Sequence, residues 1–274
     1  MTRSGNVEPQ EPTAPELVLD LLVGNVEPLC AAAICRVGEL FDLRPQVVRV
    51  AITRLLAQGK IERAGRAQYV ITRGRQELTE VVGGWWQSRA TPRAWRGNWI
   101  GVVDGDVHRQ DKRAWRKHQL ALHLRGLALL SPGLWVRPDN LQGGVAAERA
   151  HLQALGLSPQ AVVVSLRGLD SATLARACDL WREDDLPAQH TALAAELAHS
   201  AAHLASLSLA EATRESLTLG RRVIAHLLRD PLLPPKLMDP HPREVLTAGM
   251  RAYQQQARPI CRAFMAEGLD PLGT

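Results

Sequence analysis

Apolar residues near the start of the chain follow the spacing of helices. Residues 1–15 are rich in Pro, Glu and Thr and have little apolar content, which predicts a disordered lead. Order is expected from Glu16, where the run LVLDLLV predicts a short helix that ends at Gly24. A second helix is predicted over about 30–41, where the sequence is CAAAICRVGELF. After its lead, the chain therefore begins with two short helices.

A third helix and a hairpin are predicted next. Pro45 suits the first turn of a helix because its missing N–H would be unbonded there anyway, and Gly59 is a natural end. Two brief extended runs, KIERA and AQYVIT, lie on either side of Gly65-Arg66, and the second alternates as a hairpin strand does. Three helices and a hairpin form the order of a winged helix-turn-helix, so 16–75 is predicted to be a DNA-binding domain.

The pattern changes after this segment. Residues 76–96 are predicted to be a helical linker that carries three tryptophans. Over 97–169, strands are expected in NWIGVVDG, ALLSPGLWVRPDNL and AVVVSLRG, and helices in DKRAWRKHQLALHLRGL and AAERAHLQALG. The resulting order β-α-β-β-α-β is typical of a ferredoxin-like domain. Residues 170–274 are predicted to form a helical C-terminal domain interrupted at prolines, which makes the fold class α+β.

The predicted third helix has one apolar and one mainly polar side. At about 100° per residue, the apolar side holds Val47, Val48, Ala51, Ile52, Leu55 and Leu56. The opposite side holds Gln46, Arg49, Val50, Thr53, Arg54 and Ala57. An amphipathic surface helix with solvated arginines is the alternative reading of this pattern. The preceding helices and the basic hairpin favour a recognition helix instead.

Several side chains on and near this helix are of types that contact DNA. Gln46, Arg49 and Thr53 lie in adjacent turns and can hydrogen-bond base edges in the major groove. Contacts with phosphates are expected from Arg44 before the helix and Arg54 near its end, and contacts with the backbone or minor groove from the hairpin residues Arg63 and Arg66.

Positive charge is concentrated in the first half of the chain. Residues 30–75 contain nine Lys and Arg against three Asp and Glu, and residues 91–130 contain eight against three. From residue 170 to the end the balance is eleven against thirteen. This distribution is the one expected of a surface that binds phosphates.

Composition limits the other possibilities. Hydrophobic residues make up 46% and charged residues 22%, an ordinary globular mixture. No apolar run reaches the roughly 20 residues of a membrane span, and the polar start is no signal peptide, so no membrane partner and a cytoplasmic location are expected. The four cysteines, Cys30, Cys35, Cys178 and Cys261, lack zinc-ligand spacing.

Three segments together resemble the PaaX family of bacterial regulators, named after the repressor of phenylacetate catabolism. They are VRVAITRLLAQGKIERAGRAQYVIT, WRGNWIGVVDGDV and RGLALLSPGLWVRPDNL, within residues 17–170. The stretch RRVIAHLLRDPLLPPKLM is similar to the late D-P-x-L-P segment of that family. The resemblance implies a winged helix, a central ferredoxin-like domain and a helical C-terminal domain.

The resemblance also implies a function and its residues. It places Arg49, Thr53 and Arg54 on the DNA side of the recognition helix, and Arg63 and Gly65-Arg66 in the wing. It implies a homodimer on a palindromic operator that represses an aromatic-acid catabolic operon of the phenylacetate type. Release from DNA would follow binding of an aryl-acyl-CoA effector.

A site for that effector is expected among tryptophans and arginines of the middle segment. The tryptophans could form a flat aromatic pocket, and the arginines could neutralise the phosphates of coenzyme A. The candidates are Trp95, Arg96, Trp99, Arg109, Arg113, Trp135 and Arg137. Packing in the core or between domains is the alternative for each tryptophan.

A metal-dependent nuclease is the alternative function. Asp104 and Asp106 follow the first central strand, where related ferredoxin-like nucleases place a metal-binding aspartate, although a simple turn accounts for the same residues. His199 and His203 have the i, i+4 spacing of metal ligands but no third ligand nearby. No nucleotide-binding glycine motif or nucleophile motif is present, so neither catalysis nor a cofactor is expected.

Overall fold

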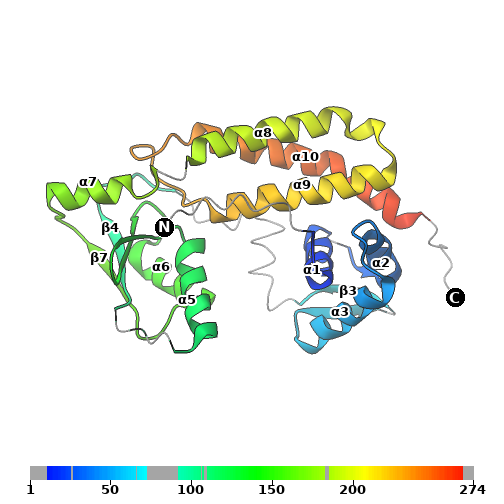
Figure 1. Ribbon diagram of the computed structural model, residues 1–274, viewed down its shortest axis with the longest axis horizontal. Helices are drawn as coiled ribbons and strands as arrows, with labels where there is room; N and C mark the ends of the chain where they lie inside the picture. Colours follow the sequence, from blue (N-terminus) through cyan, green and yellow to red (C-terminus); the bar gives the residue numbers. More distant parts are fainter. Residues whose placement is uncertain are drawn as a thin grey trace. The chain divides into compact units, whose positions relative to one another are not determined.

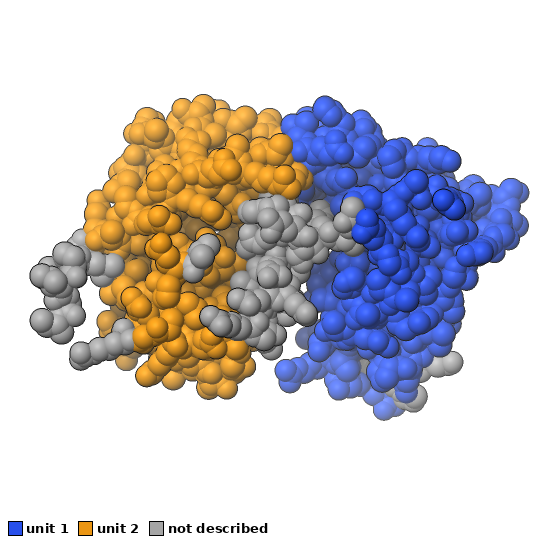
Figure 2. Space-filling model, turned by 180° about the vertical axis from the view of Figure 1, so that it is seen from behind, with its two compact units in different colours: residues 1–4, 90–192, 225–245 blue, residues 5–89, 193–224, 246–274 orange. Residues whose placement is uncertain are grey.

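The computed structural model describes residues 11–25, 27–65, 67–72, 92–105, 107, 110–182 and 185–267. Helices and two antiparallel sheets make up these residues, so the fold class is α+β. The chain divides into two compact units, coloured separately in Figure 2. Unit 1 comprises residues 1–4, 90–192 and 225–245, and unit 2 comprises residues 5–89, 193–224 and 246–274.

Unit 2 begins with a helix that starts earlier than the sequence predicts. Helix α1 spans Ala14–Gly24, whereas the disordered lead was expected to reach residue 15. The backbone N–H of Thr13 donates a 2.9 Å hydrogen bond to Glu16 Oε2, which satisfies a donor at the open end of the helix. The helix therefore begins at this cap rather than at the first apolar residue.

Two further helices and a three-stranded sheet follow (Figure 1). Helix α2 spans Ala31–Glu39 and helix α3 spans Pro45–Ala57. The sheet has the order β1-β3-β2, from strands Leu29–Cys30, Ile61–Gly65 and Gln68–Ile71, numbered β1 to β3 in chain order. Strand β1 was not expected, because a two-residue strand is too short to show a side-chain alternation.

The core of unit 2 combines both ends of the chain. Buried side chains of α1, α2 and α3 pack in one cluster with Phe264 and Met265 of helix α10 (His241–Ala266). Partly buried Leu209 and Leu217 of helix α9 (Leu209–Arg229) pack against the same cluster. Apolar area buried between segments this far apart in sequence stabilises unit 2.

Unit 1 contains a four-stranded antiparallel sheet with the order β5-β6-β4-β7. Its strands are β4 (Trp99–Val103), β5 (Ala128–Ser131), β6 (Leu134–Pro138) and β7 (Val162–Leu166). Helix α5 (Lys112–Leu124) connects β4 to β5, and helix α6 (Gly144–Leu155) connects β6 to β7. The chain order is therefore β-α-β-β-α-β.

The two faces of this sheet carry different cores. Ile100, Val102 and Trp135 pack on one face with residues of α5 and α6, such as Leu122 and Leu152. The other face is covered by α7 (Ser171–Asp179), together with Trp181 and Leu233. A sheet that is buried on both faces gives near-continuous apolar strands, which explains the unbroken run in β4.

Helix α8 (Leu186–His203) is followed by a short 3-10 helix (Leu204–Ser206), and among the described residues no helix is long and apolar enough to cross a membrane. The histidines considered as a metal pair lie on α8. His203 Nε2 is 3.2 Å from Glu215 Oε1, and its Nδ1 is 2.8 Å from the carbonyl oxygen of His199. The partners of His203 are therefore a carboxylate and a backbone carbonyl of its own helix.

Candidate nucleic-acid interface

One side of helix α3 is anchored in the core of unit 2. Val48, Ala51, Ile52 and Leu55 are buried there and pack with residues of α1 and α2. At Gly38 of α2, an added Cβ would lie 2.8 Å from Val48 Cγ2. The two helices therefore approach closely at a glycine, and α3 is held rigidly by its apolar side.

The opposite side of α3 is exposed and carries the predicted DNA-contacting residues. Gln46, Arg49, Thr53 and Arg54 are exposed, as is Arg44 just before the helix. The hydroxyl of Thr53 donates a 3.1 Å hydrogen bond to the Arg49 carbonyl oxygen. Its oxygen can still accept a hydrogen bond from another group. The structure brings all five side chains onto one surface.

Two valines are exposed on this surface, one of them against expectation. Val47 was assigned to the buried side of the helix, but 42% of it is exposed, and Val50 is 63% exposed. Val47 lies at the boundary of the apolar side of α3. It is exposed because the neighbouring helices cover only the centre of that side, at Val48, Ala51, Ile52 and Leu55. In a major groove, exposed apolar groups of this kind contact the C5-methyl group of thymine.

Arg49 also borders a cavity of about 260 Å³ between α2 and α3. Its lining includes Cys35, Arg36, Glu39 and Glu267, and Arg36 pairs with Glu267 at 2.8 Å. Burial raises the pKa of the Cys35 thiol, while the nearby Arg49 guanidinium acts in the opposite direction. The Arg49 guanidinium therefore lies near the Cys35 thiol at the border of this cavity.

A hairpin of strands β2 and β3 follows α3 in the chain, as the sequence predicts. Arg63 is exposed on strand β2, and Ala67 after the tip has a φ of 58° in the left-handed region. Gly65 pairs with Gln68 after an irregularity in the register, consistent with a tight turn. Arg66 lies outside the described residues.

The proposed aromatic pocket in unit 1 is not formed as one site. Val102 pairs with Trp135 across β4 and β6, so these two side chains lie on the same face of the sheet. Trp99 is three residues from Val102 and therefore lies on the opposite face, stacked on Trp181 with ring centroids 6.3 Å apart. Both Trp99 and Trp135 are buried in separate cores, which corrects the expectation of a shared pocket.

The arginines of that expectation are equally dispersed. Arg137 is 2% exposed and donates to the carbonyl oxygens of Arg125, Pro138 (3.3 Å) and Pro231 (3.2 Å), so its guanidinium is part of the core. Arg113 is exposed on α5, and Arg109 lies outside the described residues.

The remaining two candidates precede β4. The indole N–H of Trp95 donates a 2.6 Å hydrogen bond to the Asn98 carbonyl oxygen. Arg96 is exposed and borders a cavity with Arg93 and Arg167, two arginines that the sequence pattern did not single out. No periodic signal could have found them, because they meet only through the pairing of strands.

Asp104, the candidate nuclease residue, is enclosed. It is 2% exposed, its Oδ2 accepts a 2.9 Å hydrogen bond from Trp135 Nε1, and it lies 3.1 Å from His118 Nε2. Asp106 lies outside the described residues. Within the part of the chain that the structure describes, no group of three His, Cys, Asp or Glu side chains is placed to hold a metal ion.

Comparisons with known proteins add information on the fold. No protein-family model and no curated protein matches the sequence. The solved structure of uncharacterized protein Rv0674 from Mycobacterium tuberculosis is similar, with a TM-score of 0.60 and 22% sequence identity. The similarity covers 92% of this chain and 98% of that one, so the two proteins share a fold along nearly their whole length.

Proposed function

We propose that this protein is a DNA-binding transcription regulator that reads duplex DNA with α3. The exposed side of α3 carries this proposal, because Gln46, Arg49 and Thr53 share it with phosphate-contacting arginines. In this proposal α1 to α3 and strands β1 to β3 form a winged helix, and the β4–β7 segment is a ferredoxin-like domain. The resemblance to the PaaX family supports both assignments.

The chemistry of this surface suits a major groove. An arginine forms bidentate hydrogen bonds with guanine, glutamine forms them with adenine, and exposed valine and threonine methyl groups suit thymine. Arg44, Arg54 and Arg63 are exposed beside these groups, where they would neutralise phosphates and fix the register of the helix. Helix α3 has a packed apolar side and an exposed side with both hydrogen-bonding and apolar groups. This combination supports a recognition helix rather than an ordinary surface helix.

Selection from a random duplex library tests this proposal. The wild-type protein is expected to enrich one sequence, with thymines at positions near Val50. Arg49→Ala should relax the preference at particular positions, whereas Arg63→Ala should weaken binding of all sequences alike. No enrichment by the wild-type protein, or identical selected sequences with Arg49→Ala, would contradict the proposal.

Regulation is proposed on the resemblance alone. The protein would act as a homodimeric repressor of an aromatic-acid catabolic operon, on a palindromic operator, and would be released by an aryl-acyl-CoA effector. Such an effector must bind one dimer geometry better than the other in order to change operator affinity. Sedimentation on and off the selected DNA tests the dimer, and anisotropy with a panel of aryl-CoA thioesters tests release. An unchanged affinity across the panel would remove the effector from this proposal.

A further inference from the structure

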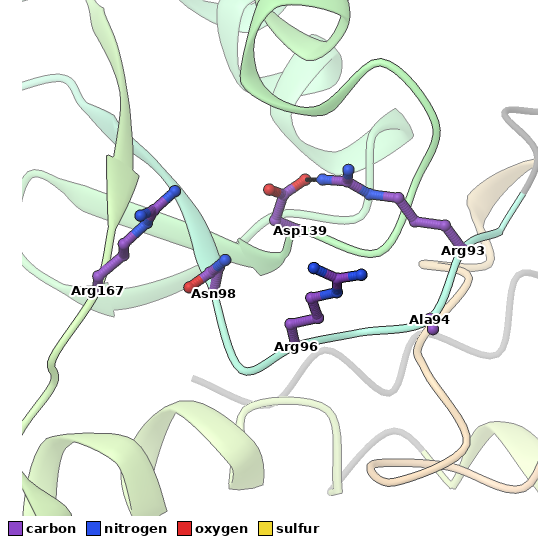
Figure 3. A pocket seen from close by; sticks show the side chains of 6 residues that line it. All are labelled: Arg93, Ala94, Arg96, Asn98, Asp139 and Arg167. Carbon is purple, nitrogen blue, oxygen red and sulfur yellow. Dashed lines mark hydrogen bonds and ion pairs between the residues drawn. The ribbon is translucent and has the colours of Figure 1, made fainter.

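A basic cavity lies at one end of the four-stranded sheet of unit 1. It has a volume of about 400 Å³ and is lined by Arg93, Ala94, Arg96, Asn98, Asp139 and Arg167. Figure 3 shows the three guanidinium groups arranged around Asn98 and Asp139. None of the lining residues is aromatic, so the cavity offers charge and hydrogen bonds rather than an apolar surface.

Strand pairing creates this arrangement. Trp99 at the start of β4 pairs with Pro138 at the end of β6 and with Leu166 at the end of β7. The residues just outside these strand ends therefore lie at the same end of the sheet: Asn98 before β4, Asp139 after β6 and Arg167 after β7. Three segments that are distant in sequence thus contribute polar side chains to one place.

Backbone hydrogen bonds hold the segment before β4 against the segment after β6. The Arg93 N–H donates to the Asn140 carbonyl oxygen at 2.7 Å, and the Asp139 N–H donates to that of Asn98 at 2.9 Å. The Trp95 indole donates to the same Asn98 oxygen. The cavity walls are therefore fixed by the fold, which lowers the ordering cost of binding a ligand.

The charges of the cavity are not balanced. Arg93 pairs with Asp139 at 2.6 Å, and the Asp139 side chain is only 11% exposed. No hydrogen bond or ion pair joins Arg96 or Arg167 to another residue that the structure describes. The lining has three arginines and one carboxylate, which leaves a net positive charge facing a cavity large enough for a small ligand.

We propose that this cavity binds the diphosphate group of a small molecule. Guanidinium groups form paired, charge-assisted hydrogen bonds with phosphate oxygens, and two arginines in one cavity can hold two adjacent phosphates. A ligand with a single carboxylate would satisfy one guanidinium only, and an apolar ligand would leave both arginines desolvated. The inference does not depend on DNA binding, because it uses only residues of unit 1.

Calorimetric titration in phosphate-free buffer of low ionic strength tests the site with inorganic pyrophosphate, ADP and coenzyme A. Wild-type protein should bind pyrophosphate saturably, with an affinity that falls as salt is added. The double variant Arg96→Gln/Arg167→Gln should bind at least about tenfold more weakly, since two charge-assisted contacts are lost. Both side chains are exposed, so the fold should persist, which circular dichroism checks.

A matched control separates the cavity from general charge. Arg116→Gln removes an exposed arginine on α5 outside the lining and should leave pyrophosphate affinity unchanged. Binding of ADP or coenzyme A through the same arginines would identify an organic source of the diphosphate and support the assignment. The proposal would be overturned by absent pyrophosphate binding in the wild type, by equal losses in the control, or by a duplex oligonucleotide binding there in place of pyrophosphate.

Discussion

Asp104 and His118, two buried polar residues of unit 1, are held by partners from other parts of the unit. The Ser158 N–H donates a 3.1 Å hydrogen bond to His118 Nδ1, so the ring proton is on Nε2 and is donated to Asp104. Asp104 also accepts from Trp135. The sequence places Asp104 after a predicted strand, where either a simple turn or a metal site would account for it. Its two buried partners could not be found from sequence because they are 14 and 31 residues away.

We expect Asp104→Ala to destabilise unit 1 strongly. It leaves the Trp135 and His118 N–H groups buried without an acceptor, at about 1–3 kcal/mol each, or roughly 2–6 kcal/mol in all. Urea unfolding measures this loss. Asp179→Ala is the control, because Asp179 is 57% exposed and pairs with Arg182 on the surface, so a change within about 0.5 kcal/mol is expected. Equal effects of the two substitutions would contradict the account of Asp104.

His226 gives unit 1 a pH dependence. Burial lowers its pKa to about 4, and the neighbouring His190, with ring centroids 4.9 Å apart, acts in the same direction against the opposing charge of Asp230. The ordinary value is 6.5, so the unfolded chain binds a proton more readily than the folded one. The stabilising contribution of the neutral ring is therefore complete above pH 6.5 and lost as the pH falls toward 4.

We expect the free energy of unfolding to fall less between pH 6.5 and 4 in His226→Gln than in the wild type. Chemical unfolding at a series of pH values measures this difference. His151→Gln, which replaces an exposed histidine of α6, should keep the wild-type profile. Parallel profiles for wild type and His226→Gln would mean that another group carries the dependence.

At the scale of elements, the sequence predicted helices α1 to α3, strands β2 and β3, and the helices and strands of the β4–β7 segment to within a few residues. It succeeded because one-sided apolar spacing and Gly or Pro boundaries are local signals. The shared tryptophan pocket failed because strand register decides which face a side chain occupies. The cavity at the end of this sheet was missed for the same reason.

The contact between α2 and α3 allows a test of element packing. Gly38→Ala places a Cβ where it would meet Val48 Cγ2 at 2.8 Å, so the Val48 side chain or α3 must shift. We expect a loss of about 1–3 kcal/mol in the free energy of unfolding and weaker binding of the selected DNA. Val48→Ala opens the space that the new methyl group needs, so the double variant should lose less than the sum of the single losses. Additive losses would contradict this close approach.

At the scale of the whole chain, the helices after residue 185 contribute to both units. The sequence predicted a separate helical domain over 170–274, since an amphipathic pattern shows that a helix has an apolar side but not what covers it. In unit 1, Arg137 and Asn140 donate to the carbonyl oxygens of Pro231 and Leu232. Such contacts across about ninety residues have no local signature.

Gly126 tests how closely this later segment packs. Its φ is +69°, and an added Cβ would lie 2.5 Å from Pro231 Cα, a backbone atom that cannot move alone. Gly126→Ala should cost at least about 3 kcal/mol from strain and overlap together. Gly168→Ala has a similar φ of +66° with open space around it, so only the conformational cost of about 1–2 kcal/mol is expected. Equal losses in thermal or urea unfolding would show that the segment is not packed there.

The central claim is that the exposed side of α3 binds duplex DNA. Fluorescence anisotropy with the duplex selected by the wild-type protein tests it most directly, with Arg49→Ala and with Arg262→Ala, an exposed arginine of α10, as the matched control. We expect salt-sensitive binding by the wild type and the control, and an affinity at least about tenfold lower for Arg49→Ala. Equal affinity of all three proteins, or no binding by the wild type at low salt, would contradict the claim.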